Sequence, residues 1–201
     1  MNLNKPKIEH FKAAEGLQYY LLDLEEFALF EGLTDKRTIE KNAALYVVRQ
    51  VLEDESLIIC YEESGKPYLK NGYKISVSHS YSKLAVLLSP KNEVGIDIEK
   101  VRDKILKIKE KFLSREELNT LGDASIEKYT LYWAAKEALY KATCLSGLLF
   151  AEQLLIAPFV FSDKGGEIKA LVKLADSEKK HTLQYKVLDD YILVYTVRTG
   201  E

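Results

Sequence analysis

The spacing of apolar side chains separates helical from extended stretches in the first half of the chain. In residues 34–53, Leu45, Val48 and Leu52 recur at roughly helical spacing, which predicts an amphipathic helix with Thr34 at its cap. Short runs rich in β-branched residues predict strands at residues 17–24, 56–63, 72–80, 83–89 and 93–99. Turn residues separate the last four runs, so we expect these runs to form an antiparallel meander.

The second half begins with helical spacing and returns to strands. Apolar residues from Val101 to Phe112 predict a helix, and Ser114 to Glu117 match a capping box that opens another. A further helix is predicted at residues 125–144. Strands follow at residues 154–162, 167–175, 182–188 and 191–198. This order of elements is typical of an α+β fold, with the rough pattern of two similar halves.

Composition and charge narrow the class of protein. The 201 residues are 47% hydrophobic and carry 29 basic and 31 acidic side chains, for a net charge of −2. This balance gives no general basic field, so we expect no nucleic acid and no anionic membrane as the main partner. The first ten residues lack an apolar run and no later stretch is long enough to span a membrane, so we expect a cytoplasmic protein.

The sequence VGIDIE, residues 94–99, places two acids in a predicted strand. Successive side chains of a strand point to opposite faces, so Ile96 and Ile98 share one face and Asp97 and Glu99 share the other. Two neighbouring carboxylates repel each other unless water or a cation reduces the repulsion. The pair is therefore a candidate for cation binding.

The sequence WAAKEALYK, residues 133–141, places charged groups on the predicted helix at residues 125–144. Glu137 and Lys141 are four positions apart and share a face with Trp133, and Lys136 lies one step around the helix. One interpretation is a surface ion pair above a tryptophan that anchors the helix in the core. The other combines Glu137 with the two acids of the strand.

Three carboxylates, from Asp97, Glu99 and Glu137, are the kind of oxygen cluster that suits Mg²⁺ shared with phosphate and water. In that case, Lys136 and Lys141 neutralise the phosphates. Zinc is not expected, because no His or Cys residues occur at ligand spacing.

Two weaker signals precede these motifs. The sequence SVSHS places Ser78 and His79 at a strand end, where exposed groups can meet a ligand, although a locally bonded turn histidine is the alternative. Gly65 to Pro67 form a GKP sequence that on its own indicates only a turn.

Taken in order, GKP, SHS, GIDIE, FLSxxE and WxxKEAxxK between Gly65 and Lys141 resemble the Sfp-type (surfactin-synthetase-activating) class of 4′-phosphopantetheinyl transferase. The resemblance implies Mg²⁺-dependent transfer of 4′-phosphopantetheine from coenzyme A to a serine of an apo acyl or peptidyl carrier protein. It also implies a pseudodimer of two α+β halves, residues 1–92 and 93–201, with the active site in the cleft between them. Because one chain then supplies both halves, we expect a monomer.

The resemblance assigns a role to each matching residue. It implies that the metal ligands are Asp97, Glu99 and Glu137, and that the catalytic residues are Glu137, Lys141 and Glu117, with capping as the alternative role for Glu117. The residues implied to contact coenzyme A are Lys66, Pro67, Ser78, His79, Lys136 and Lys141, with Lys36, Arg37 and Lys41 near its 3′-phosphate. No motif specifies which of the N-terminal basic residues contacts the 3′-phosphate.

Two other functions compete with this interpretation. Three carboxylates alone also fit a metal-dependent nucleotide phosphohydrolase, and the scaffold also suits a non-catalytic module that binds coenzyme A or a carrier. The cations between Lys100 and Lys111 form either a solvated helix face or the docking surface for an acidic carrier.

Overall fold

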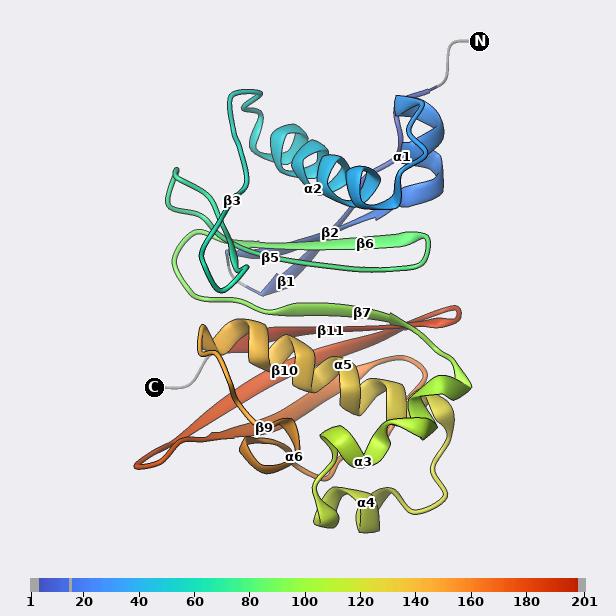
Figure 1. Ribbon diagram of the computed structural model, residues 1–201, viewed down its shortest axis with the longest axis vertical. Coiled ribbons are helices and arrows are strands. Elements are labelled where there is room, and N and C mark those ends of the chain that lie inside the picture. The colour runs from blue at the N-terminus through green and yellow to red at the C-terminus, as the bar shows by residue number, and fades with distance from the viewer. Residues whose placement is uncertain (1–3, 15, 199–201) are drawn as a thin grey trace. The chain divides into compact units, whose positions relative to one another are not determined.

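A computed structural model describes residues 4–14 and 16–198, and the chain forms two compact units, Met1–Asn92 (unit 1) and Glu93–Glu201 (unit 2). Each unit combines an antiparallel sheet with one long helix (Figure 1). This mixture of helices and antiparallel sheets agrees with the predicted α+β class. No helix among the described residues is both long and apolar enough to cross a membrane.

Unit 1 has a four-stranded sheet in the order β1-β2-β6-β5 and a separate β3-β4 pair. Its longest helix, α2, buries Ala43, Val47 and Val48 in a core shared with Leu84 and Val86 of β6. The elements are β1 (Glu9–Ala14), β2 (Leu17–Asp23), α1 (Leu24–Glu31), α2 (Lys36–Leu52), β3 (Cys60–Tyr61), β4 (Pro67–Tyr68), β5 (Lys74–Ser80) and β6 (Lys83–Ser89).

Unit 2 has a five-stranded sheet in the order β7-β11-β10-β9-β8, and α5 packs against it. The apolar side chains of α5, such as Leu131 and Leu139, share a core with Leu183 and Val194 of the sheet. The elements are β7 (Ile96–Lys100), η1 (Asp103–Lys107), α3 (Lys109–Phe112), α4 (Arg115–Leu121), α5 (Ile126–Thr143), α6 (Phe150–Gln153), β8 (Leu154–Ile156), β9 (Gly166–Lys173), β10 (Glu178–Leu188) and β11 (Tyr191–Arg198).

Several details of the sequence prediction are wrong, including the lengths of the strands predicted at residues 56–63 and 154–162, of which only Cys60–Tyr61 and Leu154–Ile156 are extended. Asp35, not Thr34, is the cap of α2, because its carboxylate accepts the Thr38 backbone N–H at 2.8 Å. The meander is formed only in part, since β5 pairs antiparallel with β6 as expected but β7 pairs with β11 in the sheet of unit 2. The helix expected from Val101 to Phe112 is divided into η1 and α3, because Ile108, at φ −119° and ψ 0°, leaves the helical conformation.

Candidate active site

Strand β7 and helix α5 approach each other to backbone contact at Gly95. A Cβ atom on Gly95 would overlap the Ala138 carbonyl oxygen and lie 2.9 Å from the Ala142 backbone nitrogen. The Gly95 N–H donates to Thr196 Oγ1 at 2.9 Å, and the Thr196 N–H donates to the Gly95 carbonyl at 2.9 Å. The glycine of the GIDIE motif is therefore required for packing, because any side chain would push the strand away from the helix.

This close packing turns the acidic face of β7 toward α5. Asp97 Oδ1 accepts a hydrogen bond from Lys141 Nζ at 2.7 Å, and the same ammonium donates to the Ile96 carbonyl at 3.0 Å. The Asp97 side chain is only 5% exposed, whereas that of Lys141 is 27% exposed. Lys141 therefore neutralises a buried carboxylate while part of its side chain still reaches solvent.

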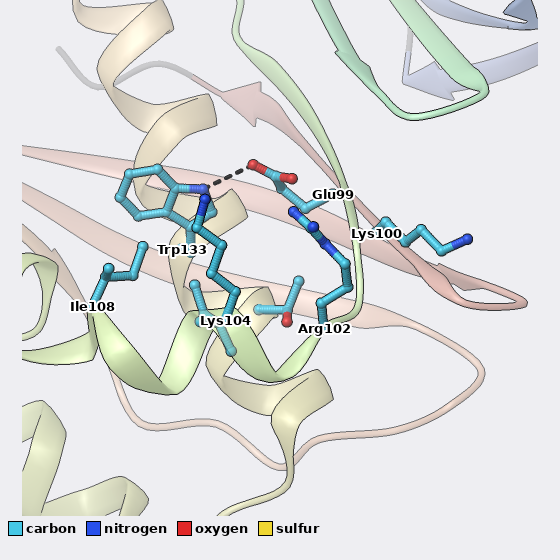
Figure 2. A pocket seen from close by; sticks show the side chains of 8 residues that line it. Glu99, Lys100, Arg102, Lys104, Ile108 and Trp133 are labelled. Atoms are coloured by element: carbon cyan, nitrogen blue, oxygen red, sulfur yellow. Dashed lines mark hydrogen bonds between the residues drawn. The ribbon is translucent and has the colours of Figure 1, made fainter.

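Glu99 also contacts α5. Its Oε1 atom accepts the indole N–H of Trp133 at 2.9 Å (Figure 2). The two residues line a pocket of about 190 Å³, together with the basic side chains of Lys100, Arg102 and Lys104. In Figure 2, Lys104 and Arg102 extend toward Glu99 and Trp133, whereas Lys100 points away. Lys100 instead pairs with Asp190 at 2.9 Å.

Glu137 lies close enough to both acids of β7 for their charges to act on it. Burial raises the pKa of Glu137 to about 7, and the negative charges of Asp97 and Glu99 add to this increase. Lys141 acts in the opposite direction, because its positive charge favours the ionised carboxylate. The structure therefore brings the predicted metal ligands and Lys141 into one electrostatic neighbourhood.

The chemistry of this donor set fits Mg²⁺, although the side chains are not already gathered around a metal position. In residues 4–14 and 16–198, no three His, Cys, Asp or Glu side chains are grouped so that they could hold a metal ion. Three carboxylates nevertheless supply the hard oxygen ligands that Mg²⁺ prefers. A cation between them would also remove the repulsion that raises the pKa of Glu137. Magnesium binding stays a prediction.

Lys136 lies apart from this neighbourhood, although it is next to Glu137 in the sequence. Its side chain is 0% exposed, and its Nζ atom donates to Glu117 Oε2 at 2.6 Å. The same ammonium donates to the carbonyls of Phe112 at 2.7 Å and Phe150 at 2.9 Å. All three protons of the ammonium group thus have partners inside the protein, which leaves none for a phosphate.

Glu117 forms the capping box that its sequence predicts. Its Oε2 atom accepts the Ser114 backbone N–H at 2.8 Å, and its own backbone N–H donates to Ser114 Oγ at 3.1 Å. Its other oxygen, Oε1, accepts the Ile156 backbone N–H at 2.8 Å. Glu117 is buried and joins the start of α4 to β8, so its contacts are structural.

The predicted coenzyme A residues of unit 1 fall on α2 and the strands after it. Lys36, Arg37 and Lys41 are exposed in the first turns of α2. His79, at the end of β5, lies with its Nδ1 atom 3.1 Å from Glu40 Oε1, and Lys36 Nζ lies 3.7 Å from the same oxygen. The structure therefore brings Lys36 and His79 to a shared carboxylate.

The remaining unit 1 residues occupy different positions. Ser78 is buried at 8% exposure, within β5. Lys66 and Pro67 are half-buried at the β3–β4 turn, where the Lys66 carbonyl accepts the Glu62 N–H at 2.9 Å. The role of Ser78, Lys66 and Pro67 with coenzyme A stays a prediction.

Sequence reasoning missed two partners at these sites. The first is Glu40, for which a signal existed, since it lies four positions after Lys36 on the same helix. The second is the bond from the Trp133 indole to Glu99. Its signal was the shared helix face of Trp133 and Glu137, which directs the indole toward the strand that carries the acids.

The fold and this site describe a mixed α/β unit in which a strand and a helix bring together carboxylates and a lysine. The family model of the 4′-phosphopantetheinyl transferase superfamily matches residues 93–196, which is more than half of the 201 residues, and the chain belongs to this superfamily. The protein is thus a transferase of this kind, and the family implies coenzyme A and a carrier protein as its partners. A search of curated proteins found no match.

Proposed function

We propose that this protein is an Sfp-type transferase that moves 4′-phosphopantetheine from coenzyme A to a serine of an apo acyl or peptidyl carrier protein. The reaction depends on Mg²⁺ and releases adenosine 3′,5′-bisphosphate. One observation carries the proposal. Within the residues matched to the superfamily, Asp97 pairs with Lys141 at 2.7 Å and Glu99 accepts the Trp133 indole N–H at 2.9 Å, so the acids of β7 contact the helix residues one turn before and one turn after Glu137.

Asp97, Glu99 and Glu137 are the residues that would hold Mg²⁺. When bound, the ion supplies charge neutralisation for the diphosphate, which is the main requirement of phosphoryl-type displacement. The Lys141 ammonium lies 2.7 Å from Asp97 Oδ1 and is partly exposed, so it supplies a second positive charge at the same place. Lys141 would thus add to the positive charge of the bound ion where negative charge develops on the departing bisphosphate.

Glu137 is the candidate general base. In the reaction, the serine oxygen forms a bond to the pantetheine phosphorus, the diphosphate P–O bond breaks, and the serine proton moves to a carboxylate. Burial raises the pKa of Glu137 to about 7 in the metal-free protein, which makes it a stronger base than an ordinary glutamate before a cation binds. Burial is the largest cause of this increase, although Glu137 is only half-buried.

Lys136 and Glu117 have a structural role in this proposal. Both are enclosed by the protein, and their polar atoms are bonded to each other and to backbone groups. Lys141 is therefore the phosphate-neutralising lysine of the WAAKEALYK motif. In unit 1, Lys36 and His79 stay proposed coenzyme A contacts, and both lie beside the Glu40 carboxylate.

The carrier protein is proposed to dock on the cations that follow β7. Lys104 and Lys107 are exposed on η1, and Lys104 lines the pocket beside Glu99. Complementary charge accelerates encounter with an acidic partner. The double variant Lys104→Glu/Lys107→Glu should lower kcat/KM for the carrier by about tenfold or more and leave coenzyme A affinity unchanged.

The matched control for docking is Lys179→Glu/Lys180→Glu, which reverses two exposed charges on β10 of the same unit. Both variants change the net charge by the same amount, so a difference between them isolates the position of the charges. Equal carrier kinetics for the two variants would eliminate η1 as the docking surface.

The test of the function is intact-mass spectrometry of an apo carrier protein after incubation with this protein, coenzyme A and Mg²⁺. A parallel reaction contains a chelator in place of Mg²⁺. The proposal predicts a Mg²⁺-dependent mass gain of one phosphopantetheine on the carrier. If coenzyme A is cleaved while every carrier stays unmodified, the protein is a hydrolase. If it binds coenzyme A and changes neither partner, it is a binding module.

A further inference from the structure

The single tryptophan of the chain is bonded to one of the proposed metal ligands. Trp133 Nε1 donates to Glu99 Oε1 at 2.9 Å, and the indole N–H has only one proton to donate. Glu99 is half-buried near the end of β7, where its longer side chain has more rotamers available than that of Asp97. The bond to the indole selects among these rotamers.

The indole itself is held by two aromatic rings. The Phe112 ring meets it edge-on, with centroids 5.1 Å apart and an interplanar angle of 67°. The Phe150 ring stacks on it at 5.6 Å and 29°. These arrangements are favourable for aromatic pairs and restrict rotation of the tryptophan. The direction of the indole N–H therefore depends on the positions of α3 and α6, which carry Phe112 and Phe150.

The buried lysine fixes those two phenylalanines. The carbonyls that accept hydrogen bonds from Lys136 Nζ are those of Phe112 and Phe150, at 2.7 and 2.9 Å. Glu117 then neutralises the ammonium and holds it in place. An unbroken chain of contacts thus leads from the Lys136–Glu117 pair through the phenylalanines and Trp133 to Glu99.

We propose that Trp133 is a positioning residue that orients Glu99 for cation binding, and that the buried Lys136–Glu117 pair supports it by fixing Phe112 and Phe150. This inference rests on the proposed function for the identity of the site. Loss of a group that orients a metal ligand through a hydrogen bond typically lowers metal affinity by about 10- to 100-fold. Trp133, Lys136 and Glu117 need not touch coenzyme A or the carrier for this role.

The first experiment is calorimetric titration of Mn²⁺, as a substitute for Mg²⁺, into the wild-type protein and Trp133→Phe. Phenylalanine retains an aromatic ring between Phe112 and Phe150 but has no N–H to donate. We expect the variant to keep its fold and to bind Mn²⁺ about tenfold more weakly. Unchanged Mn²⁺ affinity in Trp133→Phe would show that the tryptophan only packs.

The matched control is Tyr129→Phe, which removes one donor from a buried aromatic residue one turn earlier on the same helix. The Tyr129 hydroxyl donates to the Gly122 carbonyl at 2.7 Å, so its loss affects no carboxylate. We expect the control to bind Mn²⁺ as the wild type does. An equal loss of affinity in both variants would overturn the proposal, since any weakened packing of α5 would then suffice.

A double-mutant cycle connects the effect to Glu99. If Trp133 acts through Glu99, Trp133→Phe should weaken Mn²⁺ binding in the wild type but have no further effect in a Glu99→Gln background. Independent effects of the two substitutions would overturn the proposal. Because Trp133 is the only tryptophan, its emission reports this location alone, and Mg²⁺ should change the emission of the wild type but not of Glu99→Gln.

Failure of this inference can be told apart from failure of the proposed function. A wild-type protein that modifies no carrier, yet binds Mn²⁺ more tightly than Trp133→Phe does, would reject the function and support the positioning role. A wild-type protein that modifies the carrier, while Trp133→Phe binds Mn²⁺ as tightly as the wild type, would support the function and reject the positioning role.

Discussion

Helix α5 contributes two lysines to two ion pairs, five residues apart, and the surroundings of the pairs differ. Lys136 is 0% exposed and binds Glu117 and two carbonyls. Lys141 is 27% exposed and binds Asp97 and one carbonyl. The first ammonium is fully occupied by the fold, whereas the second belongs to a group of like-charged carboxylates that it only partly neutralises.

This difference shows how one short motif serves both stability and chemistry. A buried pair whose members are bonded on all sides costs much to break, so it suits a fixed structural link. A partly exposed pair beside excess negative charge can exchange partners at low cost, so it suits a site where a cation and phosphates arrive. The comparison can be tested by changing each pair separately.

The largest effect is expected for Lys136→Met. The substitution leaves Glu117 buried without its ammonium, which should lower the free energy of unfolding by about 3–5 kcal/mol. Lys136→Met/Glu117→Gln should recover part of this loss, because the double variant is neutral and glutamine still accepts a backbone N–H. Chemical denaturation measures both, with the half-buried Lys128→Met on the same helix as the control. A single variant as stable as the control would show that the pair contributes no stability.

Lys141→Met should impair activity more than stability, the opposite of Lys136→Met. We expect phosphopantetheine transfer to slow by about 100-fold or more, because a preorganised positive charge near the diphosphate is lost. The protein should lose less stability than Lys136→Met does, since the pair is partly exposed. Parallel transfer assays and denaturation curves measure the two effects. If Lys141→Met unfolds the protein while Lys136→Met impairs only transfer, the roles of the two lysines are exchanged.

Gly95→Ala tests whether the packing of β7 on α5 maintains the Lys141 pair. The new methyl group would overlap the Ala138 carbonyl, so strand and helix must separate. Overpacking of this kind costs about 1–3 kcal/mol, and transfer should decline because Asp97 moves away from Lys141. Thermal unfolding checks the first effect, with Gly72→Ala as a comparison for backbone strain alone, because φ is +90° there and a Cβ atom would meet no neighbour, whereas Gly95 has no positive φ. A Gly95→Ala protein as stable as the wild type would contradict the close approach.

The smallest effect concerns the pH dependence of stability. Because the pKa of Glu137 is raised to about 7 in the folded protein, the folded state binds a proton that the unfolded state releases above a pH of about 4.5. The contribution of Glu137 is therefore favourable at low pH and is lost as the pH rises through about 7. Glu137→Gln should raise the melting temperature of the metal-free protein by about 2–4 °C at pH 8 and by less at pH 5.

Melting curves of the wild type and Glu137→Gln at both pH values measure this effect. Saturating Mg²⁺ should remove the advantage of the variant at pH 8, because the cation stabilises the ionised wild-type carboxylate. If Glu137→Gln is equally destabilising at both pH values, the pKa of Glu137 is not raised in the folded protein.

Much of the fold could be predicted from local patterns, since residues 125–144 and 191–198 give α5 and β11 almost at their observed ends. What failed depends on distant parts of the chain. The partner of β7 is β11, about a hundred residues later, and no local pattern specifies that pairing. No local pattern predicted the division between η1 and α3 either. Ile105 and Phe112 both pack in the core, and their spacing alone does not show that the helix between them is interrupted.

The candidate site shows the same limit. The alternation of strand side chains correctly places Asp97 and Glu99 on the face that meets α5. The pattern could not distinguish Lys136 from Lys141, because both stand beside Glu137 on a helix and only the tertiary fold encloses one of them. Glu117 satisfied a capping pattern, yet its contact with Ile156 lies 39 positions away and has no local signal.

The central claim is that Asp97, Glu99 and Glu137 carry phosphopantetheine transfer, and Asp97→Asn tests it most directly. The rate at which an apo carrier gains phosphopantetheine is measured by intact-mass spectrometry with saturating coenzyme A and Mg²⁺, for the wild type and for a variant shown to be folded by circular dichroism. We predict transfer by the wild type and a rate at least about 1,000-fold lower for Asp97→Asn. A folded Asp97→Asn protein that modifies the carrier at the wild-type rate would contradict the claim.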